Sequence, residues 1–197
     1  IDAAQGILVT SGQPMKPWNP WKRNSHYILE NFLGALDSPG EWFLSRDGTL
    51  YYMPLPGEDM TKAETIAPMA EKFLVLAGDP ALGKFVEHVA IRGLSFQHGQ
   101  WLTPPGGFEP MQAAARIEAA VMADGARHVT IEDCEVAHVG VYAVWFRKGR
   151  RDCTLRRCYL YDFGAGGVRI GETGIARNEA ERTGHVLVDN NILRHGG

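Results

Sequence analysis

Residues 128–138 read His-Val-Thr-Ile-Glu-Asp-Cys-Glu-Val-Ala-His, and related segments span residues 88–98, 152–162 and 185–195. In each copy the second, fourth, seventh and ninth places are small or apolar, apart from Asn191, and a glycine follows within a few residues. Alternation of this kind is typical of strands that bury one face. Each copy therefore predicts two short strands separated by a two-residue bend.

The spacing of the copies indicates the size of one repeat. The second place moves by 40, 24 and 33 residues from copy to copy, so a bare repeat takes about 24 residues and the longer intervals hold insertions. A third strand is expected at 120–122, 144–146 and 168–170, before the later copies. Three short strands per coil, with glycine at the corners, predict an all-β, right-handed parallel β-helix. A leucine-rich repeat would need leucine and asparagine at places where this chain lacks them.

The front third of the chain has a different pattern. Arg-Asp-Gly at 46–48 lies between two apolar stretches and predicts a β-hairpin over 41–54, because glycine tolerates positive φ. We expect residues 1–80 to form an N-terminal cap or subdomain and residues 81–197 to form the β-helix coils. After residue 85, the one plausible short helix is at 111–120.

Composition and charge exclude several classes of protein. The 197 residues are 45% apolar and carry a net charge of -3, without a long basic run, so nucleic acid is not an expected partner. No stretch approaches the roughly 20 apolar residues of a membrane span, so we expect no membrane partner. Three cysteines do not make a disulfide framework or a zinc ribbon. Cys134 and Cys158 occupy the inward seventh place, where we expect buried free thiols.

Three segments carry a resemblance to a known family: residues 36–44, the end of the hairpin at 48–54, and the glycine-rich stretch 164–172. They resemble bacterial right-handed parallel β-helix proteins, several of which are glycoside hydrolases of plant cell-wall polysaccharides of the α-L-fucosidase, xylanase or β-xylosidase type. The resemblance spans residues 30–197. It implies a secreted, periplasmic or cell-surface protein that acts on a polysaccharide or oligosaccharide without a cofactor.

In such proteins more coils follow the point at which this chain stops. The sequence ends within a repeat at 193–197 and begins without the features of a signal peptide, so we expect a fragment. The family's catalytic acids can then lie beyond residue 197, and the fragment itself can be inactive. We also expect association through the exposed last coil.

Glycoside hydrolysis needs two carboxyl groups, about 5 Å or roughly 6.5–9.5 Å apart, and stacked coils can supply either spacing. The best single candidate for a catalytic residue is Glu172, which follows a predicted strand and precedes an insertion at 173–184. Trp145, Arg147 and Arg169 alternate with inward positions, so we expect them to face outward and bind a sugar or uronate. An ordinary solvated face is the alternative.

The eleventh place of the repeat holds a column of polar side chains. Its members are His98, His138, Asp162 and His195. Asp162 and His138 are candidates for catalysis, and His98 and His195 for substrate binding, in a proton-transfer strip; a His-Asp-His metal site is the alternative. We expect no metal. The eleventh place falls on the same face of the strand as the buried seventh and ninth places. Unless the strand has ended before it, we expect these side chains to point inward and to form a hydrogen-bonded ladder.

The fifth place of the repeat holds a column that alternates in charge. Its members are Arg92, Glu132, Arg156 and Asp189. Opposite charges on neighbouring strands form ladders of modest stability, so we expect a structural role for these side chains.

Two functions other than hydrolysis stay open. A polysaccharide lyase would use a basic residue to abstract the proton next to a uronate carboxyl, often with a calcium ion that neutralises this carboxyl. A non-catalytic glycan-binding or surface β-helix would bind polysaccharide without releasing sugar. The fold alone does not choose among the three.

Overall fold

The computed structural model describes residues 4–5, 7, 20, 22–108 and 111–196. The chain divides into two compact units, Ile1–Ile66 and Ala67–Gly197. Residues 67–80, which the sequence pattern groups with the cap, thus lie in the second unit.

The first unit contains an antiparallel hairpin. A short 3-10 helix, η1 (Leu33–Ala35), precedes β1 (Trp42–Leu44), which pairs with β2 (Leu50–Tyr52). Gly48 lies in the turn with a φ of 89°, and its amide donates to the carbonyl of Ser45 at 3.0 Å. The hairpin therefore forms at the glycine turn that the sequence indicates.

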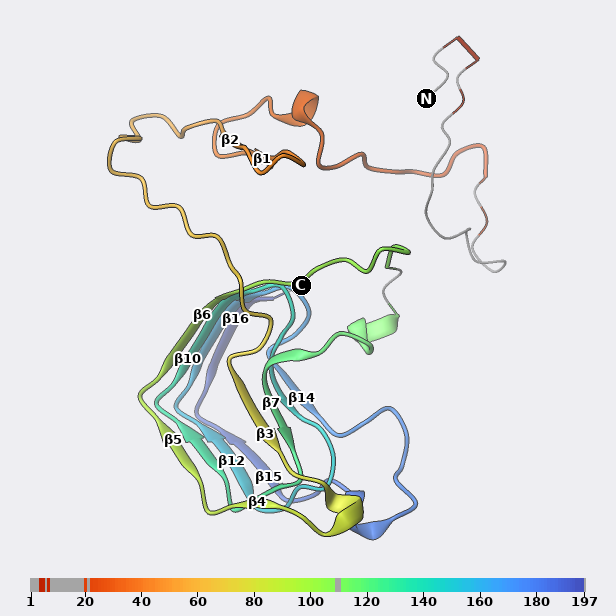
Figure 1. The fold of residues 1–197 in the computed structure, drawn as a ribbon, viewed down its shortest axis with the longest axis vertical. Coiled ribbons are helices and arrows are strands. Elements are labelled where there is room, and N and C mark those ends of the chain that lie inside the picture. Colours follow the sequence, from red (N-terminus) through yellow and green to blue (C-terminus); the bar gives the residue numbers. More distant parts are fainter. Residues whose placement is uncertain (1–3, 6, 8–19, 21, 109–110, 197) are drawn as a thin grey trace. The chain divides into compact units, whose positions relative to one another are not determined.

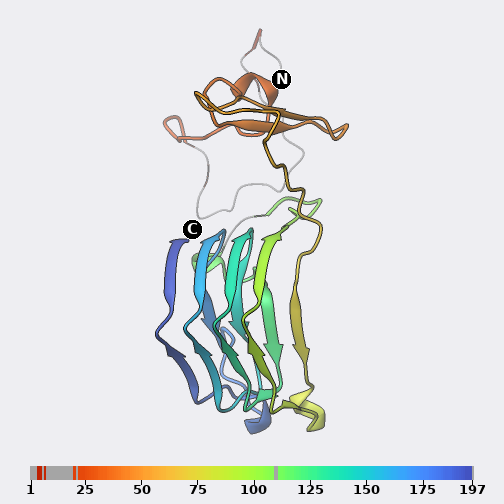
Figure 2. The ribbon, with the colours of Figure 1, turned by 90° about the vertical axis from the view of Figure 1, so that its left-hand side faces the viewer.

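The second unit is built from three four-stranded parallel sheets (Figure 1). The first has the order β14-β11-β7-β3, the second β15-β12-β9-β5 and the third β16-β13-β10-β6. Each circuit of the chain, here called a coil, adds one strand to each sheet, and Figure 2 shows the strands of successive coils side by side. This topology is consistent with a parallel β-helix.

The strands of the first sheet are β3 (Leu74–Ala77), β7 (Ala119–Asp124), β11 (Tyr142–Phe146) and β14 (Val168–Ile170). Those of the second are β5 (Ala90–Arg92), β9 (Thr130–Glu132), β12 (Cys153–Arg156) and β15 (Val186–Asp189). Those of the third are β6 (Ser95–Gly99), β10 (Glu135–Val139), β13 (Tyr159–Phe163) and β16 (Ile192–Gly196). The remaining elements are the paired strands β4 (Val86–Glu87) and β8 (Ala126–Arg127), and the 3-10 helices η2 (Pro80–Leu82), η3 (Gln112–Ala114) and η4 (Glu179–Glu181).

One register differs from the sequence-based alignment. That alignment places 120–122 opposite 144–146, whereas Val121 pairs with Val144 and Met122 pairs with Trp145. The step between these two strands is therefore one residue shorter than predicted. Because a one-residue slip exchanges the two faces of a strand, the correction changes which side chains of β7 share a face with those of β11.

The helix predicted at 111–120 does not form. Only η3 is present there, and Ala113 and Ala114 have φ values of 56° and 48°. Two consecutive residues in the left-handed region prevent an α-helix, and Ala119 already belongs to β7.

Three places of each repeat turn the chain through left-handed backbone conformations, with φ between 50° and 64°. The first place holds His88, His128, Asp152 and His185, the sixth Gly93, Asp133, Arg157 and Asn190, and the eleventh His98, His138, Asp162 and His195. L-residues enter this region at a cost, and asparagine, aspartate and histidine are the most common non-glycine residues there. The frequent histidine and aspartate at the corners thus have a backbone explanation.

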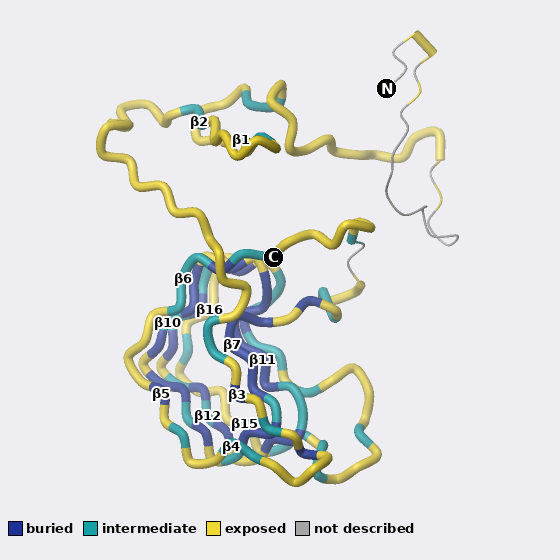
Figure 3. The backbone as a smooth tube through the Cα atoms, in the orientation of Figure 1, coloured by how far each residue is buried: buried dark blue, intermediate teal, exposed yellow. Residues whose placement is uncertain are grey.

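The inward places of the three sheets fill one core (Figure 3). Val129, Ile131, Val136, Leu155 and Leu160 are buried there. Cys134, Cys153 and Cys158 are buried free cysteines, which confirms the expectation for the seventh place. Burial raises the pKa of the Cys153 and Cys158 thiols, so they act as small apolar side chains.

The predicted charge ladder is present around Glu132, whose side chain is only 4% exposed. Its carboxylate accepts from Arg92, from Arg156 at 2.6 Å and from Arg157 at 2.9 Å. The bond from Arg156 and those from the other two guanidinium groups outweigh desolvation and lower the pKa of Glu132. The ladder thus joins three neighbouring coils.

The glycine that follows each eleventh place is required for close stacking rather than for positive φ. A Cβ atom on Gly164 would lie 2.8 Å from the carbonyl oxygen of Gly140 in the preceding coil. We therefore expect Gly164→Ala to lower the free energy of unfolding by about 1–3 kcal/mol, as measured by urea denaturation. The matched control is Gly174→Ala, because a Cβ there meets no atom within 4 Å. Equal stability of the two variants would contradict this explanation.

We also expect Glu132→Gln to lower the melting temperature by several degrees, because the guanidinium groups of Arg92 and Arg156 would then lose the carboxylate that they share. The lowered pKa means that the carboxylate contributes stability above its ordinary value of 4.5, and that this contribution is lost only as pH falls through the lowered value. Melting curves should show a constant difference from wild type between pH 6 and 8 that closes below about pH 4. Asp189→Asn, at an exposed position of the same column, is the control.

Candidate functional site

Three charged side chains gather where neighbouring strands of the first sheet end. Asp124 is the last residue of β7, Arg147 follows β11 directly, and Glu172 follows β14 by two residues. Because β7, β11 and β14 are parallel neighbours, their carboxyl ends lie along one edge of the sheet. We call these three side chains the carboxylate cluster.

Arg147 lies between the two carboxylates of the cluster. Its Nε donates to Asp124 Oδ1 at 2.8 Å and lies 3.5 Å from Glu172 Oε1. The two oxygens are therefore at most about 6.3 Å apart, the sum of the two distances. The side chain of Asp124 is 16% exposed and that of Glu172 is 39% exposed, so one is sheltered and the other is open to solvent.

The electrostatics of the cluster keep Arg147 charged. Partial burial acts to lower its pKa, but the hydrogen bond that it donates to Asp124 and the charges of Asp124, Glu172 and Glu118 raise it overall. Asp124 therefore faces a permanent cation at hydrogen-bond distance.

Trp145 is not an exposed platform for a sugar, contrary to the sequence-based expectation. Its side chain is 5% exposed, and the guanidinium carbon of Arg169 lies 3.7 Å from its ring centroid. Arg169 also donates to the carbonyl of Ala115 at 2.7 Å, which holds its guanidinium group over this ring. The indole N–H donates to the carbonyl of Gly171 at 2.8 Å, which fixes the backbone just before Glu172.

The insertion at 173–184 is anchored beside the carboxylate cluster. Gly149 donates to the carbonyl of Glu181 at 2.8 Å, and Gly184 donates to the carbonyl of Arg150 at 3.0 Å. The Thr183 hydroxyl donates to the carbonyl of Arg147 at 2.8 Å. The second half of the insertion is therefore fixed to the segment that carries Arg147.

The histidine column at the eleventh place lies on the third sheet, so it is not brought together with Glu172. His98 and His138 stack with centroids 4.9 Å apart, and His138 Nδ1 lies 2.7 Å from Asp162 Oδ2. His138, Asp162 and His195 are exposed, so the expected inward ladder is wrong. The left-handed backbone at this place breaks the alternation of the strand and directs the side chains outward.

A second column has the same composition at the first place of the repeat. It consists of His88, His128, Asp152 and His185, and the rings of His88 and His128 also stack with centroids 4.9 Å apart. His185 Nδ1 lies 3.3 Å from Asp152 Oδ1. Sequence reasoning singled out the eleventh place and passed over this one. The same set of three histidines and one aspartate thus occurs at two corners that share a left-handed backbone conformation. The catalytic and binding roles expected for the eleventh-place residues stay predictions.

Asp124 was missed because the alignment of β7 with β11 was one residue out of register. Met122 pairs with Trp145, so Asp124, two residues after Met122, lies beside Arg147, two residues after Trp145. A signal was present in the sequence, because an acidic residue ends β7 where a basic residue follows β11. An opposite charge at equivalent strand ends favours the observed register.

Among residues 4–5, 7, 20, 22–108 and 111–196, no group of three or more histidine, cysteine, aspartate or glutamate side chains is placed to hold a metal ion. Within the same described residues, no helix is long and apolar enough to cross a membrane.

Comparison with known proteins supports the fold. A solved structure described as a glycoside hydrolase is similar to this chain with a TM-score of 0.72 and 20% sequence identity. The similarity covers 85% of this chain and 35% of that one, so this chain spans about a third of its length. No protein-family model and no curated protein matches the sequence. The likeness places the chain among proteins with this fold of stacked parallel strands.

The backbone explanation of the eleventh place predicts how His138 tolerates substitution. We expect His138→Val to be less stable than His138→Asn by about 1–2 kcal/mol, because a β-branched residue is strained at a φ of 52° whereas asparagine is tolerated. Both variants lose the contact with Asp162, so their difference isolates the backbone effect. Thermal or urea unfolding measures it, and equal stability would contradict the explanation.

Proposed function

We propose that this protein is a glycoside hydrolase whose reacting groups are the carboxylates of Asp124 and Glu172. The observation that supports this proposal is their spacing, at most about 6.3 Å between the oxygens that contact Arg147. Glycosidases that retain anomeric configuration carry their two carboxyl groups about 5–5.5 Å apart, and inverting enzymes about 6.5–9.5 Å apart. The spacing favours the retaining mechanism.

In the proposed mechanism Asp124 is the nucleophile. A nucleophilic carboxylate attacks the anomeric carbon through one oxygen, and the hydrogen bond that Arg147 Nε donates to Asp124 Oδ1 at 2.8 Å orients this group. Its position at the end of a central strand, beside β11, holds the attacking oxygen in place.

Glu172 then serves as the general acid and base. This group must carry a proton when it protonates the leaving oxygen and must accept one from water in the second step. Its contact with Arg147 is longer, at 3.5 Å, and its side chain is more exposed, so Glu172 is open to exchange a proton with the leaving group and with water. Different surroundings thus separate the roles of the two carboxyl groups.

The proposal extends to the biological setting. We place the chain in a right-handed parallel β-helix with coils of about 24 residues, acting on a plant or bacterial polysaccharide outside the cytoplasm, without a cofactor. The similarity in fold to a glycoside hydrolase supports the carbohydrate-active role but identifies neither a substrate nor a location.

The test is reducing-sugar release from a panel of neutral and uronate-containing polysaccharides by purified protein. We expect Asp124→Asn and Glu172→Gln each to lower kcat by at least about 100-fold with the fold unchanged, since general acid–base catalysis alone contributes about 10²–10⁴. The matched control is Glu179→Gln, because Glu179 belongs to the same insertion and contacts Arg151 at 3.5 Å rather than Arg147. We expect it to retain wild-type kcat.

Two outcomes of this assay would contradict the proposal. A product that absorbs as an unsaturated uronate would identify a lyase. Binding of polysaccharide with no release of sugar by wild-type protein would identify a glycan-binding module.

A further inference from the structure

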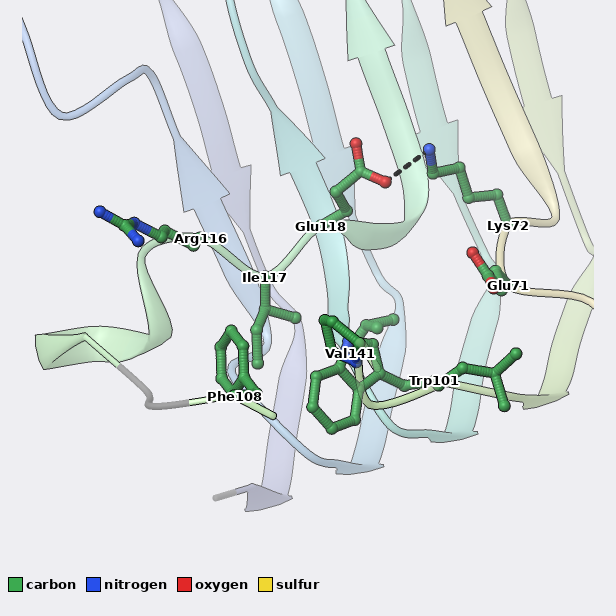
Figure 4. Close-up of a pocket in the computed structure, with 10 residues that line it drawn as sticks. Glu71, Lys72, Trp101, Phe108, Arg116, Ile117, Glu118 and Val141 are labelled. Atoms are coloured by element: carbon green, nitrogen blue, oxygen red, sulfur yellow. Dashed lines mark ion pairs between the residues drawn. The ribbon is translucent and has the colours of Figure 1, made fainter. Parts of the chain in front are cut away.

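A pocket of about 280 Å³ opens beside the start of β7, at the other end of this strand from Asp124 (Figure 4). Its lining includes Trp101, Phe108 and Val141 together with Glu71, Lys72 and Glu118. None of these residues was singled out from the sequence. Glu118 directly precedes β7 and Asp124 ends it, so the Cα atoms of these two residues lie about 20 Å apart at about 3.3 Å per residue.

One side of the pocket is apolar and aromatic. The rings of Trp101 and Phe108 meet edge to face, with centroids 5.1 Å apart and an interplanar angle of 75°. Trp101 belongs to the insertion after β6. A Cβ atom added to Gly140 would lie 3.0 Å from the Cβ of Trp101, so Trp101 packs this closely on residue 140 because that residue is glycine. Aromatic rings at a pocket wall offer a flat apolar surface to the C–H face of a ligand.

The other side of the pocket is charged. Lys72 Nζ lies 2.6 Å from Glu118 Oε2, and Figure 4 shows this ion pair with Glu71 beside it, while Arg116 extends away from them. The ammonium group is thus paired with the carboxylate of Glu118, and the carboxylate of Glu71 is a second acidic group in the lining. Such a set offers acceptors and donors to hydroxyl groups and repels a further carboxylate.

We infer that this pocket is a second carbohydrate site, which binds a single uncharged sugar ring. The volume lies just below the usual range of ligand pockets, roughly 300–1,000 Å³, and so suits one ring rather than a chain. The aromatic wall suits the apolar face of the ring, and the carboxylates suit its hydroxyl groups. The inference rests on the proposed function for the ligand class, a glycan, and adds a non-catalytic contact remote from the reacting carboxylates.

The experiment is NMR titration of protein labelled with ¹⁵N at its five tryptophans. The probes are the methyl glycosides of xylose, fucose, glucose and galactose, with the methyl glycoside of glucuronic acid as the charged counterpart. We expect at least one neutral glycoside to shift one indole N–H signal, which Trp101→Phe identifies by its disappearance, and the glucuronide to bind at least about tenfold more weakly.

Variants test the polar side of the pocket. Glu118→Gln should weaken binding of the neutral glycoside about tenfold, because hydrogen bonds to a charged group are worth more than those to a neutral amide. Glu179→Gln should leave the affinity unchanged. Absence of a shift at the Trp101 signal, equal or tighter binding of the glucuronide, or equal affinity of Glu118→Gln and wild type would overturn the inference.

The titration is repeated with Asp124→Asn, in which the proposed nucleophile is removed. Binding at Trp101 should persist there, because the two sites lie at opposite ends of β7. If hydrolysis is never observed but the Trp101 signal shifts, the proposed reaction fails while the sugar site stands. If hydrolysis depends on Asp124 but no glycoside shifts this signal, the sugar site fails alone.

Discussion

The structure of the second unit depends on three left-handed corners in every coil. A parallel stack needs sharp turns between its short strands, and these turns fall at residues with φ near 50–60°, mostly with side chains. Each such residue costs about 1–3 kcal/mol unless its surroundings stabilise it. Contacts between equivalent corner residues of neighbouring coils supply this stabilisation. His98 stacks on His138, and Arg157 donates to Asp133 at 2.8 and 2.9 Å.

Much of the fold follows from local pattern. The four repeat copies, the glycine turn of the hairpin, the buried cysteines and the charge column around Glu132 all depend on residue type and spacing. The backbone conformation at the corners was not predicted, because alternation along a strand carries no information about a residue that leaves the strand conformation. The outward direction of His138 and Asp162 was missed for this reason.

The candidate site was predicted in part. Glu172 was predicted from its place after a strand and Arg147 from its alternation with inward positions, and the two do lie together. Asp124 was missed because it depends on the register between β7 and β11, which a one-residue difference in coil length changes. Trp145 was correctly placed on the strand beside Arg147 but was expected to be exposed. The side chain of Arg169 covers it and is itself held by the carbonyl of Ala115, and neither contact can be inferred from alternation alone.

These contacts give one physical account of the first sheet. Trp145 holds Gly171, the insertion at 173–184 is fixed beside Arg147, and Arg147 joins the two carboxylates at a spacing suited to a retaining glycosidase. The most direct test is mass spectrometry of the protein after reaction with an activated 2-deoxy-2-fluoro glycoside of a sugar that it hydrolyses. The account predicts a covalent sugar adduct on the peptide that contains Asp124. An adduct on a different residue, or hydrolysis with inversion and no adduct, would contradict it.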